Sequence, residues 1–333
     1  MAVFHGGNLA AAAQRFSVPQ EKWVDLSTGI NPHPYPIPPL EQDHWGRLPD
    51  QKLLQDLKEA AAFYYGVDDP EKVIPVSGTQ TLLQILPHLF EKPKKVRIIG
   101  PTYKEHAYCW SLAGHDVMEV EDVYDAADEA DILIIVNPNN PTGDVYEPDF
   151  LLELAAKQHA KGGYLIVDGA FLDCRPSLDI SSHAGTDGLI ILRSFGKFFG
   201  LAGIRLGFVL AGGKLADRLR DGIGPWAVNG PAMEIGKRAF RDVAWIKQTR
   251  ADLIKATQRL DEILGSASID VVGGTSLFRY CHHPKAPHIF EGLGKQGVLV
   301  RPFEDRAQYL RIGLPGPEKH WAILQESLKE LDL

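Results

Sequence analysis

Residues 132–168 read ILIIVNPNNPTGDVYEPDFLLELAAKQHAKGGYLIVD, and this stretch decides the fold class. Its two ends, 132–136 and 164–167, are short continuous apolar runs, which are typical of strands buried on both faces of a sheet. The segment 148–160 between them has the length and the periodicity of a helix. A strand, a helix and a second strand in this order predict a parallel pair of strands joined by a crossover helix.

The same alternation continues in both directions along the chain. Further strands are expected at 72–76, 96–99, 117–120, 189–192 and 205–210. A helix is expected between Pro49 and Gly66, because apolar residues recur there at spacings of three and four: Leu53, Leu54, Leu57, Ala61 and Tyr64. We therefore expect an α/β fold built on a three-layer, mostly parallel sheet.

The two ends of the chain have a different character. Five prolines between positions 32 and 39 exclude a helix or a central strand, so residues 1–47 are expected to form an irregular, extended N-terminal arm. Beyond Gly230 the pattern predicts one long helix over 232–264, and then the shorter elements of an α+β domain: strands at 276–281, 298–302 and 309–312, and helices at 287–296 and 318–331. The predicted organisation is an arm (1–47), a large domain (48–230) and a small C-terminal domain (231–333).

Composition excludes several classes of protein. The 333 residues are 44% hydrophobic and 23% charged, which is enough apolar material for a buried core and excludes a disordered chain. The net charge of −8 argues against nucleic-acid binding, which needs a basic surface. The longest strongly apolar run, 132–136, is too short to span a membrane. Three scattered cysteines (Cys109, Cys174, Cys281) and the lack of a signal peptide predict a reduced, cytoplasmic protein.

Polar residues follow the expected strands at the edge where ligands bind in such sheets. Ser77, Gly78 and Thr79 follow the strand at 72–76 and open a helix, where their backbone N–H groups would form an anion site or an ordinary helix cap. Asp168 ends the strand at 164–167. A buried carboxylate there needs a positive partner, and its function is either to hold a protonated ring nitrogen or to cap the next segment.

Lys197 is the strongest candidate for a catalytic residue. It lies between two glycines and next to three phenylalanines: Gly196, Gly200, Phe195, Phe198 and Phe199. An apolar turn disfavours the ammonium and makes a neutral, nucleophilic amine accessible. The alternative is a lysine whose charged end reaches the solvent. The three rings favour the nucleophile.

Rival motifs are incomplete. The stretch from Ser194 to Lys197 matches the S-x-x-K of serine acyl enzymes, but S-D-N and K-T-G are absent from the sequence. A Walker A motif is excluded because Phe198 follows Gly196-Lys197. The adjacent His282 and His283 would face apart on a strand, so no metal site is expected. The remaining chemistry is a lysine amine condensed with an aldehyde.

Taken together, Asn137-Pro-Asn-Asn-Pro-Thr-Gly143, Asp168-Gly-Ala170 and Ser194-x-x-Lys197 with Arg205 resemble the fold-type I pyridoxal-phosphate enzymes of aminotransferase class I/II. The resemblance runs from about residue 20 to the C-terminus. It implies a seven-stranded sheet in a large domain, a small C-terminal domain, pyridoxal 5′-phosphate as cofactor and a homodimer.

The resemblance also implies a role for each matching residue. Lys197 would form the Schiff base with the cofactor aldehyde, Asp168 would keep the ring nitrogen protonated, and Tyr103 would stack on the ring. Gly78, Thr79, Ser194 and Arg205 would hold the phosphate, Asn140 would donate to the phenolic oxygen, and Ser77 would be a further cofactor contact.

A finer resemblance lies at the N-terminus, where His5-Gly-Gly-Asn8 and Asp25-Leu-Ser-Thr-Gly-Ile-Asn-Pro32 resemble the threonine-phosphate decarboxylases of cobalamin biosynthesis. It implies an arm that folds over the site. It also implies that Arg311 binds the substrate α-carboxylate through two N–H groups, and that Arg301 is the cation that binds the substrate phosphate or carboxylate. For His5 the alternative is a disordered terminus. The residues expected to bind substrate are His5, Thr28, Gly29, Asn31, Asn140, Arg301 and Arg311.

The activity implied is decarboxylation of a phosphorylated amino acid, O-phospho-L-threonine, to (R)-1-aminopropan-2-yl phosphate for the aminopropanol arm of cobalamin. The alternatives are a histidinol-phosphate aminotransferase or another class I/II aminotransferase, and, from another class of protein, a non-catalytic pyridoxal-phosphate carrier. A carrier would not need Arg301 and Arg311. Three positions depart from the wider family: Phe171 and Leu48 stand where relatives often have Tyr, and Gly169 replaces the usual Glu.

Overall fold

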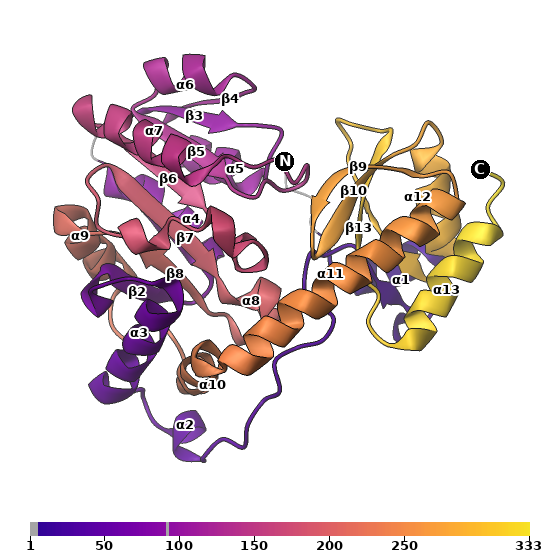
Figure 1. The fold of residues 1–333 in the computed structure, drawn as a ribbon, viewed down its shortest axis with the longest axis horizontal. Coiled ribbons are helices and arrows are strands. Elements are labelled where there is room, and N and C mark those ends of the chain that lie inside the picture. The colour runs from indigo at the N-terminus through magenta and orange to yellow at the C-terminus, as the bar shows by residue number, and fades with distance from the viewer. Residues whose placement is uncertain (1–5, 91–92) are drawn as a thin grey trace. The chain divides into compact units, whose positions relative to one another are not determined.

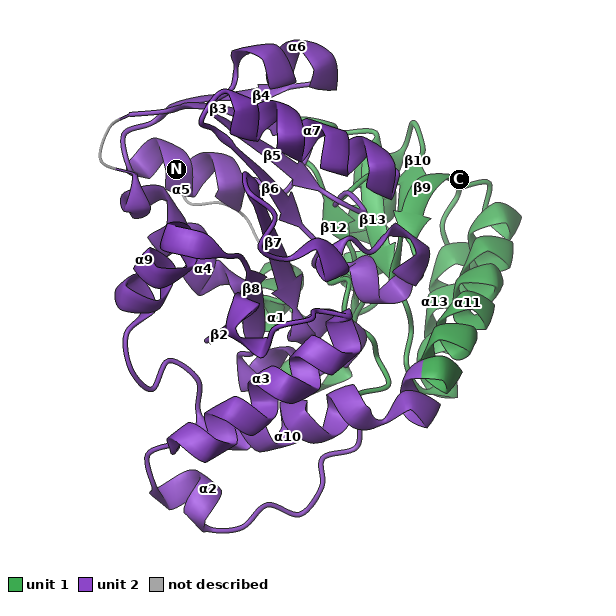
Figure 2. Ribbon diagram, turned by 60° about the vertical axis from the view of Figure 1, so that its left-hand side comes forward, with its two compact units in different colours: residues 1–34, 141–143, 247–333 green, residues 35–140, 144–246 purple. Residues whose placement is uncertain are grey.

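The structure, a computed structural model, describes residues 6–90 and 93–333. The chain forms two compact units (Figure 2). The large unit comprises residues 35–140 and 144–246, and the small unit comprises residues 1–34, 141–143 and 247–333. These units divide the chain after Pro34 and Ile246, and the three-segment organisation of 1–47, 48–230 and 231–333 stays a prediction.

Among the described residues, seven strands of the large unit form one sheet in the order β2-β8-β7-β6-β5-β3-β4 (Figure 1). All neighbours in this sheet are parallel except β8, which is antiparallel to both β7 and β2. The predicted α/β fold and mostly parallel sheet are confirmed. The strands are β2 (Val73–Val76), β3 (Lys95–Ile99), β4 (Asp116–Val120), β5 (Ile132–Val136), β6 (Tyr164–Asp168), β7 (Leu189–Ser194) and β8 (Gly207–Leu210).

Helices connect these strands and pack on the sheet. The predicted helices at 148–160 and between Pro49 and Gly66 are confirmed as α7 and α3, and Gly66 ends α3 in a left-handed conformation at φ 69°. The helices of the large unit are α2 (Asp43–Gly46), α3 (Gln51–Tyr65), α4 (Thr79–Ile85), α5 (Glu105–Leu112), α6 (Val123–Glu129), α7 (Pro148–Ala160), α8 (Phe195–Phe198), α9 (Gly213–Ile223) and α10 (Gly230–Arg241).

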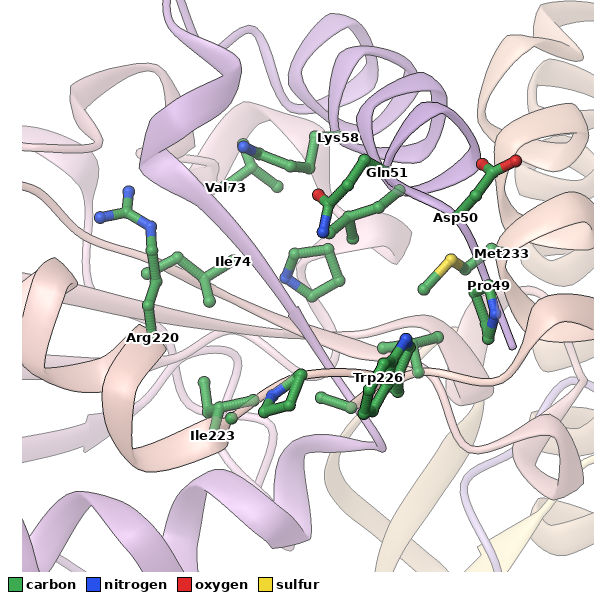
Figure 3. Close-up of a pocket in the computed structure, with 16 residues that line it drawn as sticks. Pro49, Asp50, Gln51, Lys58, Val73, Ile74, Arg220, Ile223, Trp226 and Met233 are labelled. Atoms are coloured by element: carbon green, nitrogen blue, oxygen red, sulfur yellow. The ribbon is translucent and has the colours of Figure 1, made fainter.

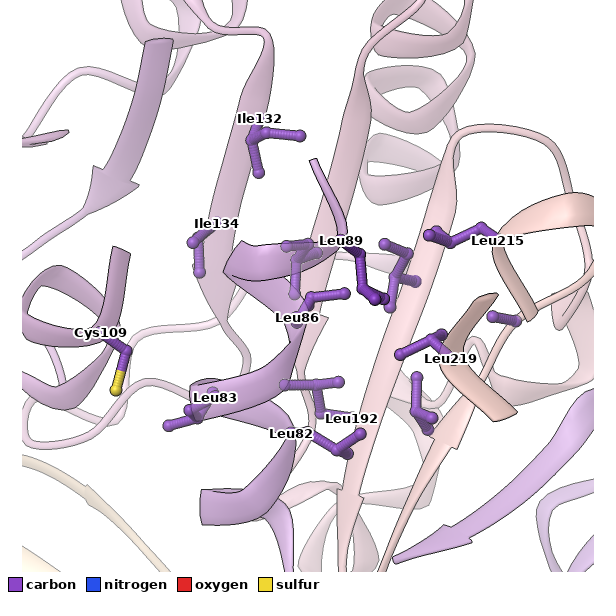
Figure 4. Packing of buried hydrophobic residues seen from close by; sticks show 14 of the residues in the cluster. Leu82, Leu83, Leu86, Leu89, Cys109, Ile132, Ile134, Leu192, Leu215 and Leu219 are labelled. Carbon is purple, nitrogen blue, oxygen red and sulfur yellow. The ribbon is translucent and has the colours of Figure 1, made fainter. Parts of the chain in front are cut away.

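The core of the large unit explains why its strands read as continuous apolar runs. Every residue of β5 is buried, so the strand has no solvent-facing side. Alternate residues of the strands pack on one side with α4, α5 and α9 (Figure 4). This cluster includes Leu82, Leu86, Trp110, Ile132, Ile134, Ile166, Ile190, Leu192, Leu215 and Leu219. Burial at about 25 cal/mol per Å² of apolar surface is the main stabilising contribution to the sheet.

The small unit is an α+β structure. Counting only described strands, four of them form an antiparallel sheet in the order β12-β13-β10-β9, and β1 pairs with β11 in parallel. The elements are α1 (Leu9–Phe16), β1 (Val24–Asp25), β9 (Asp270–Thr275), β10 (Phe278–His282), α12 (Ala286–Lys295), β11 (Val298–Leu299), β12 (Arg301–Pro302), β13 (Tyr309–Gly313) and α13 (Glu318–Lys329). The helix α11 (Val243–Ser266) leads into it from the large unit.

Two local predictions were wrong. The arm is irregular through its prolines, but it contains α1, which begins where the Asn8 side chain accepts from the Ala11 N–H at 3.1 Å. The helix predicted over 232–264 is two helices, α10 and α11. Asp242 separates them: its backbone leaves the helical region, and its Oδ1 accepts from the Trp245 N–H at 3.0 Å.

One strand of the small unit, β9, was not predicted; it lies before the strand expected at 276–281. Gly273 and Gly274 lie in this strand, and backbone atoms pass close to both. A Cβ at Gly273 would lie 2.0 Å from the Thr142 carbonyl oxygen.

In the part of the chain that the structure describes, no helix has the length and apolarity needed to cross a membrane.

Candidate active site

Four strands of the large unit bring polar residues to one edge of its sheet. Strand β2 is antiparallel to β8, and β8 is antiparallel to β7, so β2 runs parallel to β7, β6 and β5. The carboxyl ends of these strands therefore share one edge. Ser77, Asn137, Asp168 and Ser194 lie at or directly after those ends. The structure thus brings together the predicted cofactor residues of the large unit at the edge that binds ligands in such sheets.

Asp168 is the last residue of β6 and is only 5% exposed. Its Oδ1 accepts from the Ala170 N–H at 3.0 Å, so it does cap the following turn. Its Oδ2 lies 2.9 Å from Nε2 of His106, which is also buried. The carboxylate is thus fixed from two sides, and a buried acid held in this way suits a cationic partner such as a protonated pyridine nitrogen.

His106 is a site residue that the sequence reasoning missed. It lies in the first turn of α5, and its ring meets the Tyr103 ring edge to face at a centroid distance of 6.2 Å. Its Nδ1 is buried and has no hydrogen-bond partner among the described residues. His106 therefore touches both Asp168 and Tyr103, and it positions the two groups that are expected to contact the cofactor ring.

Tyr103 is held at its other end by a polar chain. Its hydroxyl donates to Oε1 of Gln80 at 3.3 Å, and Nε2 of Gln80 donates to Oε2 of Glu105 at 2.6 Å. Glu105 is buried and Tyr103 is half-buried. The ring plane of Tyr103 is therefore set by contacts to both α4 and α5, as a ring that stacks on a cofactor requires.

The predicted phosphate-binding residues, here called the phosphate cup, lie around the start of α4. Gly78 caps this helix with φ 79°, and a Cβ on it would come within 2.5 Å of Nη2 of Arg205. The Arg205 guanidinium thus occupies the space above Gly78. A Cβ on Gly207 would lie 2.8 Å from the Thr79 backbone nitrogen, so β8 also approaches the cup closely. An exposed Arg205 beside helix N–H groups is a suitable donor set for a phosphate.

Lys197 lies in the short helix α8, directly after β7, and is half-buried. Its three neighbouring phenylalanines are fully buried. The Phe195 and Phe199 rings stack at 4.3 Å, and both contact Phe240. The rings therefore anchor α8 in the core and fix the position of the lysine relative to β7. Gly196 is required here because a Cβ would lie 2.8 Å from Cα of Ala202.

The asparagines of the loop after β5 have different roles. Asn137 exchanges two hydrogen bonds with the backbone of Tyr146, and Asn139 binds the Pro101 carbonyl and the Thr102 hydroxyl. Both are buried and shape the loop. Asn140, the residue predicted to contact the cofactor and the substrate, is half-buried at the end of this braced segment.

Two departures from the wider family have local explanations. A Cβ at Gly169 would lie 2.5 Å from Cδ1 of Leu172, so the usual Glu would require the Leu172 side chain to move. Phe171 is buried, in line with its lack of a hydroxyl. The segment that follows is held by Arg193, whose fully buried guanidinium pairs with Asp173 and Asp179.

The candidate substrate residues belong to the small unit, except Asn140. Arg301 on β12 lies directly opposite Arg311 on β13, so both side chains leave the same face of the sheet. Nη2 of Arg311 donates to the Ser27 carbonyl at 2.7 Å, and its guanidinium lies over the Phe278 ring. Like charges directly opposite each other destabilise a sheet, and bound anions would offset that cost.

The remaining predictions in the small unit fall on the N-terminal segment. Gly29 and Asn31 are buried and Thr28 is half-buried. Oδ1 of Asn31 accepts from the His33 N–H at 2.9 Å, so this side chain also shapes its own turn. His5 lies outside the described residues.

Tyr280, which faces Arg311 from β10, was not predicted as a site residue. Burial raises the pKa of Tyr280 to about 12, which keeps the phenol protonated.

A surface cavity of about 320 Å³ in the large unit contains none of the predicted site residues (Figure 3). It is lined by residues of α3 and the loop before it, of β2, of the end of α9 and the segment after it, and of α10, including Asp50, Lys58, Ile74, Arg220, Trp226 and Met233. Trp226 has φ 56° and is 61% exposed. An exposed tryptophan beside a hollow is typical of an interaction surface rather than of the chemistry at the strand ends.

Comparison with known proteins agrees with this geometry. Residues 21–324 match the family model "Aminotransferase class I and II". The chain is 43% identical to a threonine-phosphate decarboxylase of Pseudomonas aeruginosa, over 97% of this chain and 96% of that protein. It is 41% identical to a threonine-phosphate decarboxylase of a Sinorhizobium species, over 99% of both chains. Its fold is similar to that of histidinol-phosphate aminotransferase from Sinorhizobium meliloti in complex with pyridoxal-5′-phosphate (TM-score 0.83, 20% identity, covering 99% of this chain and 95% of that one).

Proposed function

The chain belongs to the aminotransferase class I and II family, and from this premise we propose that it decarboxylates O-phospho-L-threonine with pyridoxal phosphate as cofactor. Two relatives that are 41–43% identical over nearly the whole chain carry that activity in their names. Within the structure, the observation that carries the proposal is the cross-strand pair Arg301 and Arg311. Two guanidinium groups on one face match a substrate with a carboxylate and a phosphate.

The residues of the large unit suit pyridoxal phosphate. Gly78, Thr79, Ser194 and Arg205 would hold the phosphate, and the buried Asp168 would hold the ring nitrogen. Tyr103, Asn140 and Ser77 would complete the contacts, and Lys197 would carry the cofactor covalently. When bound, the cofactor draws electrons away from the Cα of the attached amino acid.

Decarboxylation requires that the protein orient the substrate so that the bond between Cα and the carboxylate breaks, and not another bond of Cα. Arg311 binds the α-carboxylate through a planar pair of N–H groups and fixes its direction. The bond between Cα and the carboxylate breaks, and carbon dioxide leaves. The Lys197 amine, or a water molecule, then delivers a proton to Cα. The product is (R)-1-aminopropan-2-yl phosphate, which is the aminopropanol precursor of cobalamin, and the phosphate group is held by the second arginine throughout.

The direct test is to supply O-phospho-L-threonine to the purified, cofactor-loaded protein and to identify what is released. We expect carbon dioxide and 1-aminopropan-2-yl phosphate in equal amounts. Transfer of the amine to 2-oxoglutarate without carbon dioxide would contradict the proposal and would support an aminotransferase. Histidinol phosphate with 2-oxoglutarate should be included as the substrate pair of that alternative.

Substitutions at the two arginines should separate carboxylate from phosphate recognition. If Arg301 binds the phosphate, Arg301→Gln should lower kcat/KM for O-phospho-L-threonine by about 10²-fold, since truncating one partner of a bound charge pair costs about 2–5 kcal/mol. Any decarboxylation of unphosphorylated L-threonine should stay unchanged. Arg311→Lys should lower both, because an ammonium cannot replace the planar fork.

The matched control is Arg15→Gln, which removes an exposed arginine of the same unit that pairs with Glu291. It should leave the kinetics unchanged. Equal losses for both substrates in Arg301→Gln would show that Arg301 binds the carboxylate instead.

We also propose that the protein is a homodimer. Trp45, Leu48 and Trp226 are 65%, 67% and 61% exposed, and Leu48 precedes Pro49, which lines the same cavity as Trp226. Large apolar side chains gathered on a surface are typical of an interface. Sedimentation equilibrium should give a mass of twice 36.8 kDa, and the mass of a single chain at micromolar concentration would contradict the dimer. A cytoplasmic location stays a prediction.

A further inference from the structure

Ser27 is a buried polar residue at the junction of the N-terminal segment and the small unit's sheets. It is 1% exposed. Its N–H and its hydroxyl both donate to Oδ1 of Asp25, at 2.9 and 2.6 Å. The same hydroxyl oxygen accepts from the Gly7 N–H at 2.8 Å. The serine side chain therefore joins Asp25 to the segment that follows His5.

The other side of Ser27 faces Arg311. The Ser27 carbonyl accepts from Nη2 of Arg311 at 2.7 Å. The next carbonyl back, that of Leu26, accepts from the Gly313 N–H at 2.7 Å, and the Leu26 N–H donates to Leu299 at 2.8 Å. The backbone at Ser27 is thus fixed between β11 and β13, and it holds the Arg311 guanidinium in one orientation.

Gly6 and Gly7 permit this close approach. A Cβ on Gly6 would lie 2.4 Å from the Ser27 carbonyl oxygen, the same atom that accepts from Arg311. Gly7 has φ 83°, which side-chain-bearing residues rarely adopt. The N-terminal segment therefore lies against the acceptor of Arg311, and it does so because positions 6 and 7 carry no side chain.

We propose that Ser27 and Asp25 are positioning residues that couple the order of the Gly6–Gly7 segment to the orientation of Arg311, and thereby set the affinity for the phosphorylated amino-acid substrate. This inference rests on the proposed function, in which Arg311 binds the substrate carboxylate. Because such coupling is reciprocal, a substrate that engages Arg311 should also order the N-terminal segment.

The test uses Ser27→Ala in the full-length, cofactor-loaded enzyme. The variant keeps the carbonyl that holds Arg311 and loses the hydroxyl contacts to Asp25 and Gly7. We expect KM for O-phospho-L-threonine to rise about tenfold, as the loss of one or two buried hydrogen bonds would cause, with kcat within about twofold. Hydrogen exchange in peptides covering Gly7 should become faster, and added substrate should slow it less than in the wild type.

A second variant approaches the same coupling from the other side. Gly6→Ala leaves Ser27 and Asp25 intact but places a methyl group against the Ser27 carbonyl. It should reproduce the rise in KM, and the double variant should be no worse than either single one, because both break the same link. The matched control is Ser266→Ala, since Ser266 is an exposed serine of the same unit whose hydroxyl donates to Glu262 at 2.8 Å. It should change neither KM nor exchange at Gly7.

The outcomes separate the inference from the function on which it rests. If the wild type releases carbon dioxide but Ser27→Ala and Gly6→Ala leave KM unchanged, or lower kcat alone, the coupling is wrong and the function stands. If KM rises without faster exchange at Gly7, the coupling is also wrong. If the wild type releases no carbon dioxide from O-phospho-L-threonine, the proposed function fails, and the substrate role of the coupling fails with it.

Discussion

Lys197→Ala is expected to abolish decarboxylation, with a fall in kcat of about 10³-fold or more, because it removes both the covalent attachment of the cofactor and the amine that returns a proton to Cα. The visible absorption of the lysine-bound cofactor should vanish as well. The measurements are carbon dioxide release from O-phospho-L-threonine and the absorption spectrum of the protein after pyridoxal phosphate is added and the excess removed.

The loss in Lys197→Ala should not come from unfolding. The helix that carries Lys197 is anchored by Phe195, Phe198 and Phe199, which the substitution leaves in the core. Circular dichroism should therefore match the wild type. Lys214→Ala, at an exposed lysine of α9, is the control and should keep both the absorption band and the activity. A Lys197→Ala protein that retains the band would show that the cofactor is attached elsewhere.

The sheet could be predicted from sequence because its strands are buried on both faces. In β5 every position is apolar, so neither face had to be assigned before the strand could be recognised. The Asp242 break could not be predicted in this way. An Asp within an amphipathic pattern is compatible with a continuous helix, and only its backbone angles and its bond to Trp245 distinguish a cap from a solvated side chain.

The same contrast holds for the candidate site. Lys197 and Asp168 could be proposed because they follow strands and fit a familiar combination of motifs. His106 could not, because its partner Asp168 is 62 residues away and no spacing links the two. Ser27 lies within the motif at residues 25–32, but its importance depends on its carbonyl, which binds Arg311 from 284 positions away. The available sequence signals were weaker: a histidine three residues after Tyr103, and a serine two residues after Asp25.

Asp168 is the residue whose charge, rather than its shape, should matter most. Its carboxylate is 5% exposed and fixed by His106 and the Ala170 N–H, so an amide of the same shape can occupy the same place. Replacement by asparagine therefore isolates the negative charge. His106→Leu is the comparison, because it keeps the negative charge of Asp168 and removes the hydrogen bond that orients the carboxylate.

We expect Asp168→Asn to lower kcat by about 10²- to 10³-fold, because removing one partner of a buried charge pair costs about 3–5 kcal/mol and a neutral amide cannot keep a ring nitrogen protonated. Cofactor content should remain near one per chain, since Lys197 and the phosphate cup are untouched. His106→Leu should lower kcat by a smaller factor, about tenfold, because the charge remains and only a buried hydrogen bond is lost. The measurements are kcat from carbon dioxide release and the bound cofactor after alkaline release. If Asp168→Asn kept kcat within threefold of the wild type, the carboxylate would be a cap of its turn and nothing more, and the acid facing the cofactor would have to be sought elsewhere in the fold.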